Sequence, residues 1–228
     1  MPEIDRYRLI TFDVYTALFD VESSLTPVVK KVLGTDLDSL ELVRAWRRKQ
    51  LEYALISNSL HQMRIPFELI TRRALDDTLT RANVRPDETS RMHLVESWGD
   101  LQPWPEAPSV LEALKARGYS LGLLSNGDNS MLQALRKKLP GIIDHVFSSE
   151  QAGYYKPHPS VYALPLELSG LTAQAVLHVA GSPTDVLGTK AAGLSCAWSN
   201  RQHQPVLDKD YQADYEFSDL NQLPEILK

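Results

Sequence analysis

The sequence predicts an α/β fold, in which a parallel sheet has helices on both faces and a helical bundle is inserted after the first strand. From residue 119 onward, short buried-strand patterns alternate with helical patterns, and such alternation with short connections indicates a parallel sheet. The stretch from about 22 to 96 shows helical periodicity and no convincing strand. We therefore expect this stretch to be an insertion into the sheet domain.

The first strand is expected over residues 6–13, an apolar run rich in β-branched and aromatic types and bounded by charge. In the helical stretch, 3–4-residue spacing places four apolar residues on one face, namely Leu40, Val43, Leu51 and Ala54. Thr35 and Asp36 precede this helix as candidate N-caps. The proline-rich segment 98–109, "WGDLQPWPEAPS", is typical of a domain crossing.

Beyond the crossing, the expected elements follow in turn. The strands are 119–126, 144–150, 175–181 and 195–200, and the helices are 130–139, one beginning near 160, and 184–194. The first strand completes this sheet. The sequence thus predicts a core domain of residues 1–20 and 98–228 and a helical cap domain of residues 21–97.

Composition limits the function classes. The chain has 228 residues, of which 43% are hydrophobic, so it can bury a full core. A net charge of −5 with scattered lysines and arginines argues against nucleic acid and anionic membranes as partners. No 18-residue apolar run occurs and the N-terminus is charged, so we expect a soluble, cytoplasmic protein. The lone Cys196 excludes an intramolecular disulfide and a thiolate metal site.

Polar side chains stand where the predicted strands end. They are Asp13 after the first strand, Ser125 and Asn126 after the second, Ser182 and Asp185 after a later one, and Lys156 in a loop. Reactive groups gather beyond the carboxyl ends of parallel strands, so these side chains are expected to converge. Each residue alone could equally be a turn former. Four such strand ends together favour a functional site.

Four segments resemble a known family. "FDVYTALFD" (12–20) is similar to its nucleophile motif, "SNG" (125–127) to its second motif, "YKPHPSVY" (155–162) to its lysine motif, and "WRRKQLEY" (46–53) to its arginine-bearing cap segment. Over nearly its full length the chain resembles the haloacid dehalogenase superfamily and, within it, the L-2-haloacid dehalogenases. The resemblance implies a Rossmann-like core with an inserted helical-bundle cap, and the analogy with the family suggests a homodimer.

The residue two positions after Asp13 distinguishes between reactions. Phosphatases of this superfamily have a second aspartate there, which protonates the departing alkoxide, and they bind Mg²⁺ with a further acid near 181. This chain has Tyr15 and Gly181 instead. A halide is a weak base that needs no proton, so the resemblance implies displacement of halide from a small, anionic 2-haloacid without metal or other cofactor. A magnesium-dependent phosphatase and a catalytically diverged relative remain the alternatives.

Matching positions gives each residue a role. Asp13 is the expected nucleophile and forms an aspartyl ester, while Lys156 is expected to keep Asp13 ionised by lowering its pKa. Ser125 is expected to donate a hydrogen bond to a carboxylate oxygen. Asp185 is expected to activate or orient the water that cleaves the ester.

The remaining predicted residues bind substrate. Arg47 is expected to bind the substrate carboxylate or the departing halide. In the alternative, Leu42, Trp46, Tyr53 and Ile56 form the core face of the helix and Arg47 is solvated. Tyr15, Phe67 and Tyr162 are expected to line an apolar pocket. Asn126 and Ser182 complete the predicted set.

The chain also departs from the family pattern. Thr16 and Ala17 stand where the family usually has glycine and threonine, and Ala180, Ser182 and Thr184 replace a usual serine, asparagine and tryptophan. These changes bear on the identity of the substrate. "DLD" at 36–38 has the spacing of a phosphatase motif, but it opens a helix and is expected to be a cap.

Overall fold

The computed structural model describes residues 6–34, 37–60 and 63–227. Within these residues, parallel strands form one sheet in the order β5–β4–β1–β6–β7–β8. The strands are β1 (Leu9–Phe12), β4 (Ser120–Ser125), β5 (His145–Ser148), β6 (Val176–Ala180), β7 (Ser195–Ser199) and β8 (Tyr215–Phe217). All five predicted strands are confirmed with shorter ends, whereas β8 was not predicted.

Strand β1 lies in the middle of the sheet, between β4 and β6. Its four residues, LITF, are all buried, because a central parallel strand is covered on both faces and reads as a continuous apolar run. Thr11 pairs in register with Gly122 on one side and His178 on the other. The chain leaves β1 at Asp13, at the carboxyl edge of the sheet.

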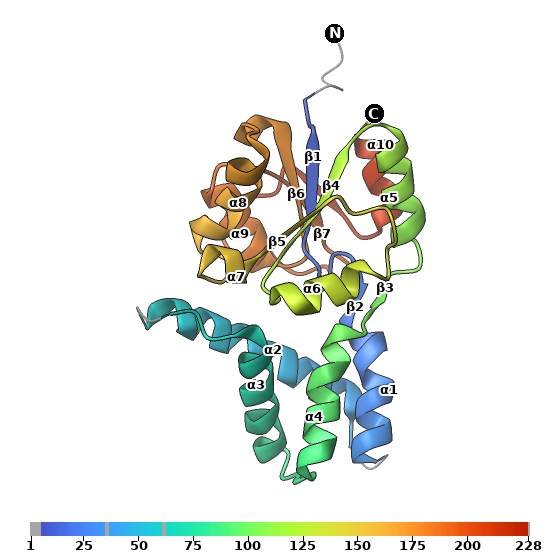
Figure 1. Ribbon diagram of the computed structural model, residues 1–228, viewed down its shortest axis with the longest axis vertical. Helices are drawn as coiled ribbons and strands as arrows, with labels where there is room; N and C mark the ends of the chain where they lie inside the picture. Colours follow the sequence, from blue (N-terminus) through green and yellow to red (C-terminus); the bar gives the residue numbers. More distant parts are fainter. Residues whose placement is uncertain (1–5, 35–36, 61–62, 228) are drawn as a thin grey trace.

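Helices cover both faces of this sheet, as Figure 1 shows. On one side lie α7 (Ser149–Ala152), α8 (Pro159–Ser169) and α9 (Pro183–Ala191), and on the other α5 (Ala107–Ala116) and α10 (Leu223–Ile226). Helix α6 (Asn129–Arg136) lies near the carboxyl ends of the strands, and short 3-10 turns η3 (Ala173–Ala175) and η4 (Leu220–Gln222) connect elements. The predicted α/β class with helices on both faces is confirmed.

A group of helices extends from the carboxyl edge of the sheet (Figure 1). It comprises α1 (Val21–Leu33), α2 (Ser39–Ser59), α3 (Phe67–Arg81) and α4 (Glu88–Glu96), followed by the 3-10 turn η2 (Ser97–Gly99). The chain enters and leaves through an antiparallel pair, β2 (Phe19–Asp20) and β3 (Gln102–Pro103). This arrangement agrees with an insertion between the first two sheet strands, and the division at residues 20/21 and 97/98 stays a prediction.

Aspartates begin several of these helices. The side chain of Asp20 accepts a hydrogen bond from the Ser23 N–H, and that of Asp38 accepts one from the Glu41 N–H, both at 3.0 Å. The predicted capping role of the "DLD" segment is therefore confirmed for Asp38. The predicted caps Thr35 and Asp36 lie outside the described residues.

Helix α2 buries a broader face than its spacing predicts. Val43 and Ala54 of the predicted face are buried, whereas Leu40 and Leu51 are only half-buried. The alternative face is also partly correct, because Leu42 and Trp46 are buried while Tyr53 is half-buried and Ile56 is exposed. The reason is that α2 packs against both α1 and α3. Neither predicted face alone accounts for the buried residues of α2, because the helix has neighbours on two sides.

One loop of the sheet domain caps a helix of the insertion. The carboxylate of Asp128, which precedes α6, accepts hydrogen bonds from the backbone N–H groups of Phe67 at 3.1 Å and Glu68 at 3.0 Å. It also forms a nearly buried ion pair with Arg64. Because Phe67 and Glu68 open α3, Asp128 fixes the start of this helix against the sheet domain.

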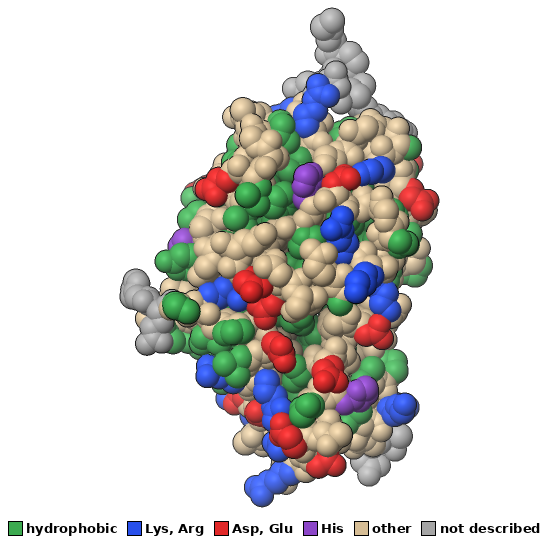
Figure 2. Space-filling view, viewed as in Figure 1, with side chains coloured by type: hydrophobic (Ala, Val, Ile, Leu, Met, Phe, Trp, Pro, Cys, Tyr) green, Lys and Arg blue, Asp and Glu red, His purple; other side chains and the backbone are tan. Residues whose placement is uncertain are grey.

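Acidic and basic side chains are interspersed on the surface that Figure 2 shows. This face carries no large patch of a single charge. Among the described residues, no helix combines the length and the apolar character needed to cross a membrane.

Candidate active site

Asp13 lies at the carboxyl end of the central strand. Its backbone N–H donates to the Val179 carbonyl at 2.9 Å, which continues the pairing of β1 with β6 by one residue. The residue is 8% exposed, and its Oδ1 accepts a hydrogen bond from Lys156 Nζ at 3.3 Å. The sheet therefore presents a nearly buried carboxylate beside a cation.

Burial outweighs the lysine in setting the protonation of this carboxyl. Loss of solvent raises the pKa of Asp13 to about 6, while the charge of Lys156 acts in the opposite direction and Asp185 adds to the rise. The predicted effect of Lys156 has the right sign. The pKa of Asp13 is nevertheless raised overall, because burial acts more strongly than the charge of Lys156.

Lys156 bridges two carboxylates. Its Nζ lies 3.3 Å from Asp13 Oδ1 and 3.1 Å from Asp185 Oδ2, and the residue is buried. Its backbone N–H donates to the side-chain oxygen of Asn126 at 2.8 Å. Asn126 thus holds the lysine loop in place, and its predicted contact with substrate stays a prediction.

Asp185 is held by donors on both oxygens. Its Oδ1 accepts from the Tyr162 hydroxyl at 2.8 Å, and its Oδ2 accepts from Lys156. The Asp185 N–H in turn donates to Ser182 Oγ at 3.3 Å at the start of α9. Although burial acts in the opposite direction, Lys156 and these hydrogen bonds hold the pKa of Asp185 below its usual range. Tyr162 and Ser182 therefore position Asp185, and a contact of either with substrate stays a prediction.

His178 joins this cluster and was not predicted. It lies in the middle of β6 and is fully buried. Its Nε2 lies 3.0 Å from Asp185 Oδ2 and 3.2 Å from Lys156 Nζ, and its Nδ1 lies 2.9 Å from Thr11 Oγ1. A single ionisable ring in the apolar run "VLHVA" was the signal that could have revealed it, since buried polar groups need partners.

Arg47 reaches the site from α2. Its Cζ lies 5.1 Å from the centre of the Tyr15 ring and 5.7 Å from that of Trp98, a geometry typical of cation–π contacts. Its Nη1 donates to Gln50 Oε1, and Gln50 Nε2 donates to Thr71 Oγ1 at 2.6 Å. The alternative of a solvated Arg47 is therefore wrong. Gln50, Thr71 and Trp98 were missed because the sequence does not show which residues of α2, α3 and η2 meet.

Aromatic rings surround the arginine. Tyr15 stacks on Phe67 with ring centres 5.4 Å apart and meets Trp98 edge-on at 5.7 Å. All three residues are at most 1% exposed. The Tyr15 hydroxyl and Trp98 Nε1 are buried without a hydrogen-bond partner among the described residues. Burial raises the pKa of Tyr15 far above its usual range, so this phenol is a poor general acid.

Ser125 is fully buried at the end of β4. Its Oγ accepts a hydrogen bond from the Gly127 N–H at 3.3 Å. Within the described chain its hydroxyl proton is not donated to another residue, so it is free for a carboxylate oxygen. The predicted donor role of Ser125 stays a prediction.

The backbone leaves no room for an acidic side chain at 181. A Cβ on Gly181 would lie 2.7 Å from Asp13 Oδ2 and 2.8 Å from the Ala17 nitrogen. Nearby, Thr16 has a φ of 104°, a conformation that favours glycine and is strained for a β-branched residue. Across residues 6–34, 37–60 and 63–227, no three His, Cys, Asp or Glu side chains are placed to hold a metal ion.

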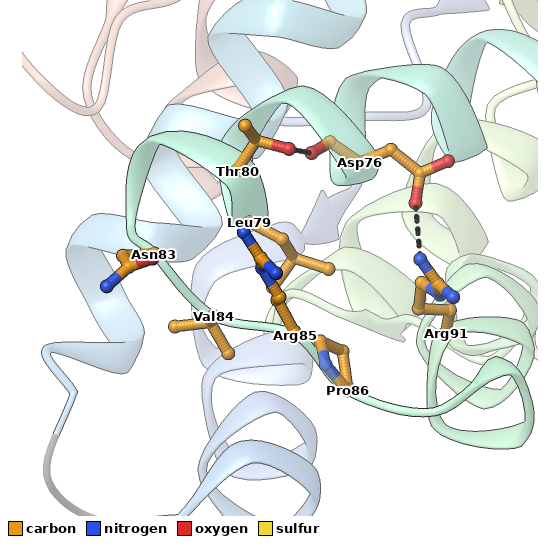
Figure 3. A pocket seen from close by; sticks show the side chains of 8 residues that line it. All are labelled: Asp76, Leu79, Thr80, Asn83, Val84, Arg85, Pro86 and Arg91. Carbon is orange, nitrogen blue, oxygen red and sulfur yellow. Dashed lines mark hydrogen bonds and ion pairs between the residues drawn. The ribbon is translucent and has the colours of Figure 1, made fainter.

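A separate hollow lies at the far end of the helical group, between α3 and the loop that precedes α4 (Figure 3). Its wall contains an ion pair between Asp76 and Arg91 at 3.7 Å. Both side chains are about one-third exposed or more, so water screens their charges. The lining of this hollow does not include Asp13, Lys156, His178 or Asp185, so the hollow is not the candidate active site.

Comparison with known proteins agrees with this geometry. Residues 7–193 match the model of the haloacid dehalogenase-like hydrolases. Haloacetate dehalogenase H-2 of Moraxella sp. (strain B) is 35% identical over 96% of this chain and 92% of its own length, and (S)-2-haloacid dehalogenase 4A of Burkholderia cepacia is 31% identical over 95% and 90%. The structure of L-2-haloacid dehalogenase from Xanthobacter autotrophicus superposes with a TM-score of 0.88 at 29% identity, covering 97% of this chain and 98% of that one. The chain belongs to the haloacid dehalogenase-like hydrolases.

Proposed function

We propose that this protein hydrolytically displaces halide from small 2-haloacids through an ester with Asp13. The observation that carries the proposal is the nearly buried carboxylate of Asp13 beside Lys156. Position 15, where a poorer leaving group would require a general acid, is occupied by the phenol of Tyr15. The names of the similar dehalogenases support the same reaction.

In the first step, an oxygen of Asp13 attacks the carbon that bears the halogen. The new C–O bond forms as the C–X bond breaks, and the halide leaves with the bonding pair. Arg47, whose charge acts on Asp13, binds the substrate carboxylate or receives the halide. Aromatic walls exclude water and strengthen these interactions.

In the second step, water adds to the carboxyl carbon of the Asp13 ester. The ester C–O bond breaks, one water proton passes to the departing alkoxide, and the other is released to solvent, so that the products are the 2-hydroxy acid, the free Asp13 carboxylate and a proton. The pKa of Asp185 is lowered, so this carboxylate is a weak base. We therefore propose that it orients the water and stabilises the charge of Lys156, and that it does not act mainly as a proton acceptor.

Two features support a reaction without metal. Both oxygens of Asp185 already accept hydrogen bonds from protein donors, and no acidic side chain fits at Gly181. A divalent cation would have to displace Lys156 or His178 to reach Asp185. These features disfavour the magnesium-dependent phosphatase.

The buried walls also limit the substrate. Tyr15, Phe67 and Trp98 are nearly inaccessible, so we propose acids of two or three carbons, such as haloacetates and 2-halopropanoates. We further propose that residues 21–97 act as a cap that brings Arg47 and Phe67 to the core. A homodimer in the cytoplasm stays a prediction of the sequence.

Halide release tests the proposal. We expect release from bromoacetate or 2-bromopropanoate in the presence of a chelator, and loss of release in Asp13→Asn. Single turnover in oxygen-18 water should place the label on Asp13. Release of phosphate from an aryl phosphate only with Mg²⁺, and no halide release from either acid, would overturn the proposal.

A further inference from the structure

His178 has no part in the two proposed steps, yet it contacts two of the groups that do. Strand β6 is otherwise apolar, and a fully buried imidazole there is costly unless its nitrogens find partners. Both do. Nδ1 lies 2.9 Å from Thr11 Oγ1 on the neighbouring strand, and Nε2 faces Asp185 and Lys156.

The contact with Asp185 favours the tautomer that carries its proton on Nε2. If Nδ1 carried the proton, the lone pair of Nε2 would face Asp185 Oδ2 at 3.0 Å, which is repulsive. With the proton on Nε2, the Thr11 hydroxyl donates to Nδ1 and Nε2–H donates to Asp185. Lys156, 3.2 Å from Nε2, can direct its own protons to the two carboxylates. The ring therefore supplies Asp185 with a second donor on Oδ2.

We propose that His178 is a positioning residue that shares the Asp185 carboxylate with Lys156, so that the lysine stays in contact with Asp13. Lys156 Nζ is nearly equidistant from the two carboxylates, at 3.3 Å from Asp13 and 3.1 Å from Asp185. Without the imidazole, Asp185 Oδ2 keeps the lysine as its remaining donor in the cluster and draws it away from Asp13. The inference rests on the proposed function only for the role of Asp13 as nucleophile.

The surroundings of the ring keep it neutral. Burial lowers the pKa of His178, and Lys156 acts in the same direction while Asp185 opposes it. The other ionisable groups near the ring are the Tyr162 phenol, whose ring centre is 6.0 Å away, and Cys196, which pairs with His178 on β7. Burial raises the pKa of both, so neither supplies charge at neutral pH. His178 thus acts by donating a hydrogen bond and not by titrating.

Two amide variants separate positioning from packing. In His178→Gln the side-chain amide reaches about as far as Nε2 and can donate to Asp185. In His178→Asn the amide ends near Nδ1, keeps the contact with Thr11 and cannot reach Asp185. His178→Phe preserves the ring volume without any hydrogen bond, and His145→Gln, on the exposed end of β5, is the distal control.

The first readout is the pH dependence of kcat/KM for halide release. We expect His178→Asn and His178→Phe to lose roughly 10-fold or more in kcat/KM and to shift the acid limb upward by about half a pH unit or more. The Gln variant should keep most of the wild-type kcat/KM and most of the wild-type position of the acid limb. His145→Gln should match the wild type in both. Equal losses in the Asn and Gln variants, or an unshifted acid limb in a folded Asn variant, would overturn the inference.

The second readout does not need turnover. In protein labelled with ¹³C at the aspartate carboxyl carbons, the Asp13 signal is assigned by its loss in Asp13→Asn. We expect this carboxyl to titrate at higher pH in His178→Asn than in the wild type and in His178→Gln. Unchanged titration refutes the role of His178 even when the wild type releases halide. A shifted titration in a protein that releases no halide supports that role and refutes the proposed function instead.

Discussion

Replacement of Asp13 should stabilise the protein at neutral pH. The pKa of Asp13 is about 6 in the folded chain against 3.8 for an ordinary aspartate. One pKa unit corresponds to about 1.36 kcal/mol, so ionised Asp13 costs the folded state roughly 3 kcal/mol. Asp13→Asn removes this cost because the amide is similar in size and never carries charge.

The pH dependence isolates this cost from other effects of the substitution. Because the pKa of Asp13 is raised on folding, its contribution favours the folded state fully below about pH 4 and is lost as pH rises through 6. The stability advantage of Asp13→Asn over the wild type should therefore be larger at pH 7.5 than at pH 4.5 by about 2 kcal/mol. Any constant effect of the amide cancels in this difference.

Urea unfolding at the two pH values, followed by far-UV circular dichroism, measures the effect. Asp185→Asn is the matched control. Its pKa is lowered on folding, so its stabilising contribution is present above about pH 4 and lost below it. Because Asp185 also raises the pKa of Asp13, its removal lessens the cost of ionised Asp13, so this variant should be destabilised less at pH 7.5 than at pH 4.5. An Asp13→Asn advantage that is equal at both pH values would refute our account of burial at Asp13.

Three further predictions concern the surroundings of the site. Arg47→Lys should lower kcat/KM for halide release roughly 10- to 100-fold, because a lysine cannot reproduce the planar contacts with the Tyr15 ring and an anion; Arg48→Lys, an exposed neighbour, is the control. Asp128→Asn should lower the free energy of unfolding by about 1–3 kcal/mol, because its ion pair with Arg64 is nearly buried, whereas Asp87→Asn, an exposed cap of α4, should cost less than about 1 kcal/mol. Thr16→Gly should raise the free energy of unfolding by roughly 1 kcal/mol, because glycine adopts a φ of 104° without strain.

Each of these has a result that contradicts it. Equal losses for the two arginine variants would show that the position of Arg47 does not matter. Equal costs for the two aspartate variants would show that Asp128 does not join α3 to the sheet domain. A Thr16→Gly protein less stable in urea than the wild type would show that contacts of the threonine outweigh the strain.

The strands were predictable because each is a short, buried and apolar run with polar residues at its end. Strand β8 was not, since its three residues, YEF, include an exposed Glu216 and carry little pattern. At the site, Asp13, Lys156 and Asp185 were brought together as expected, because parallel strands end at one edge. The sequence could not show that Tyr162 and Ser182 both face Asp185. Such contacts depend on how α8 and α9 pack on the sheet.

Two carboxylates share one lysine here, and their surroundings drive their pKa values apart. Asp13 has Lys156 as its hydrogen-bond donor and the pKa is raised, whereas Asp185 accepts from Lys156, His178 and Tyr162 and the pKa is lowered. A carboxylate that is poorly stabilised when ionised is the better nucleophile, and one that is strongly stabilised is the better fixed charge. The difference supports the proposed bond-forming role of Asp13. It also gives the buried His178 a function. Each hydrogen bond that Asp185 accepts from another residue weakens its competition with Asp13 for Lys156.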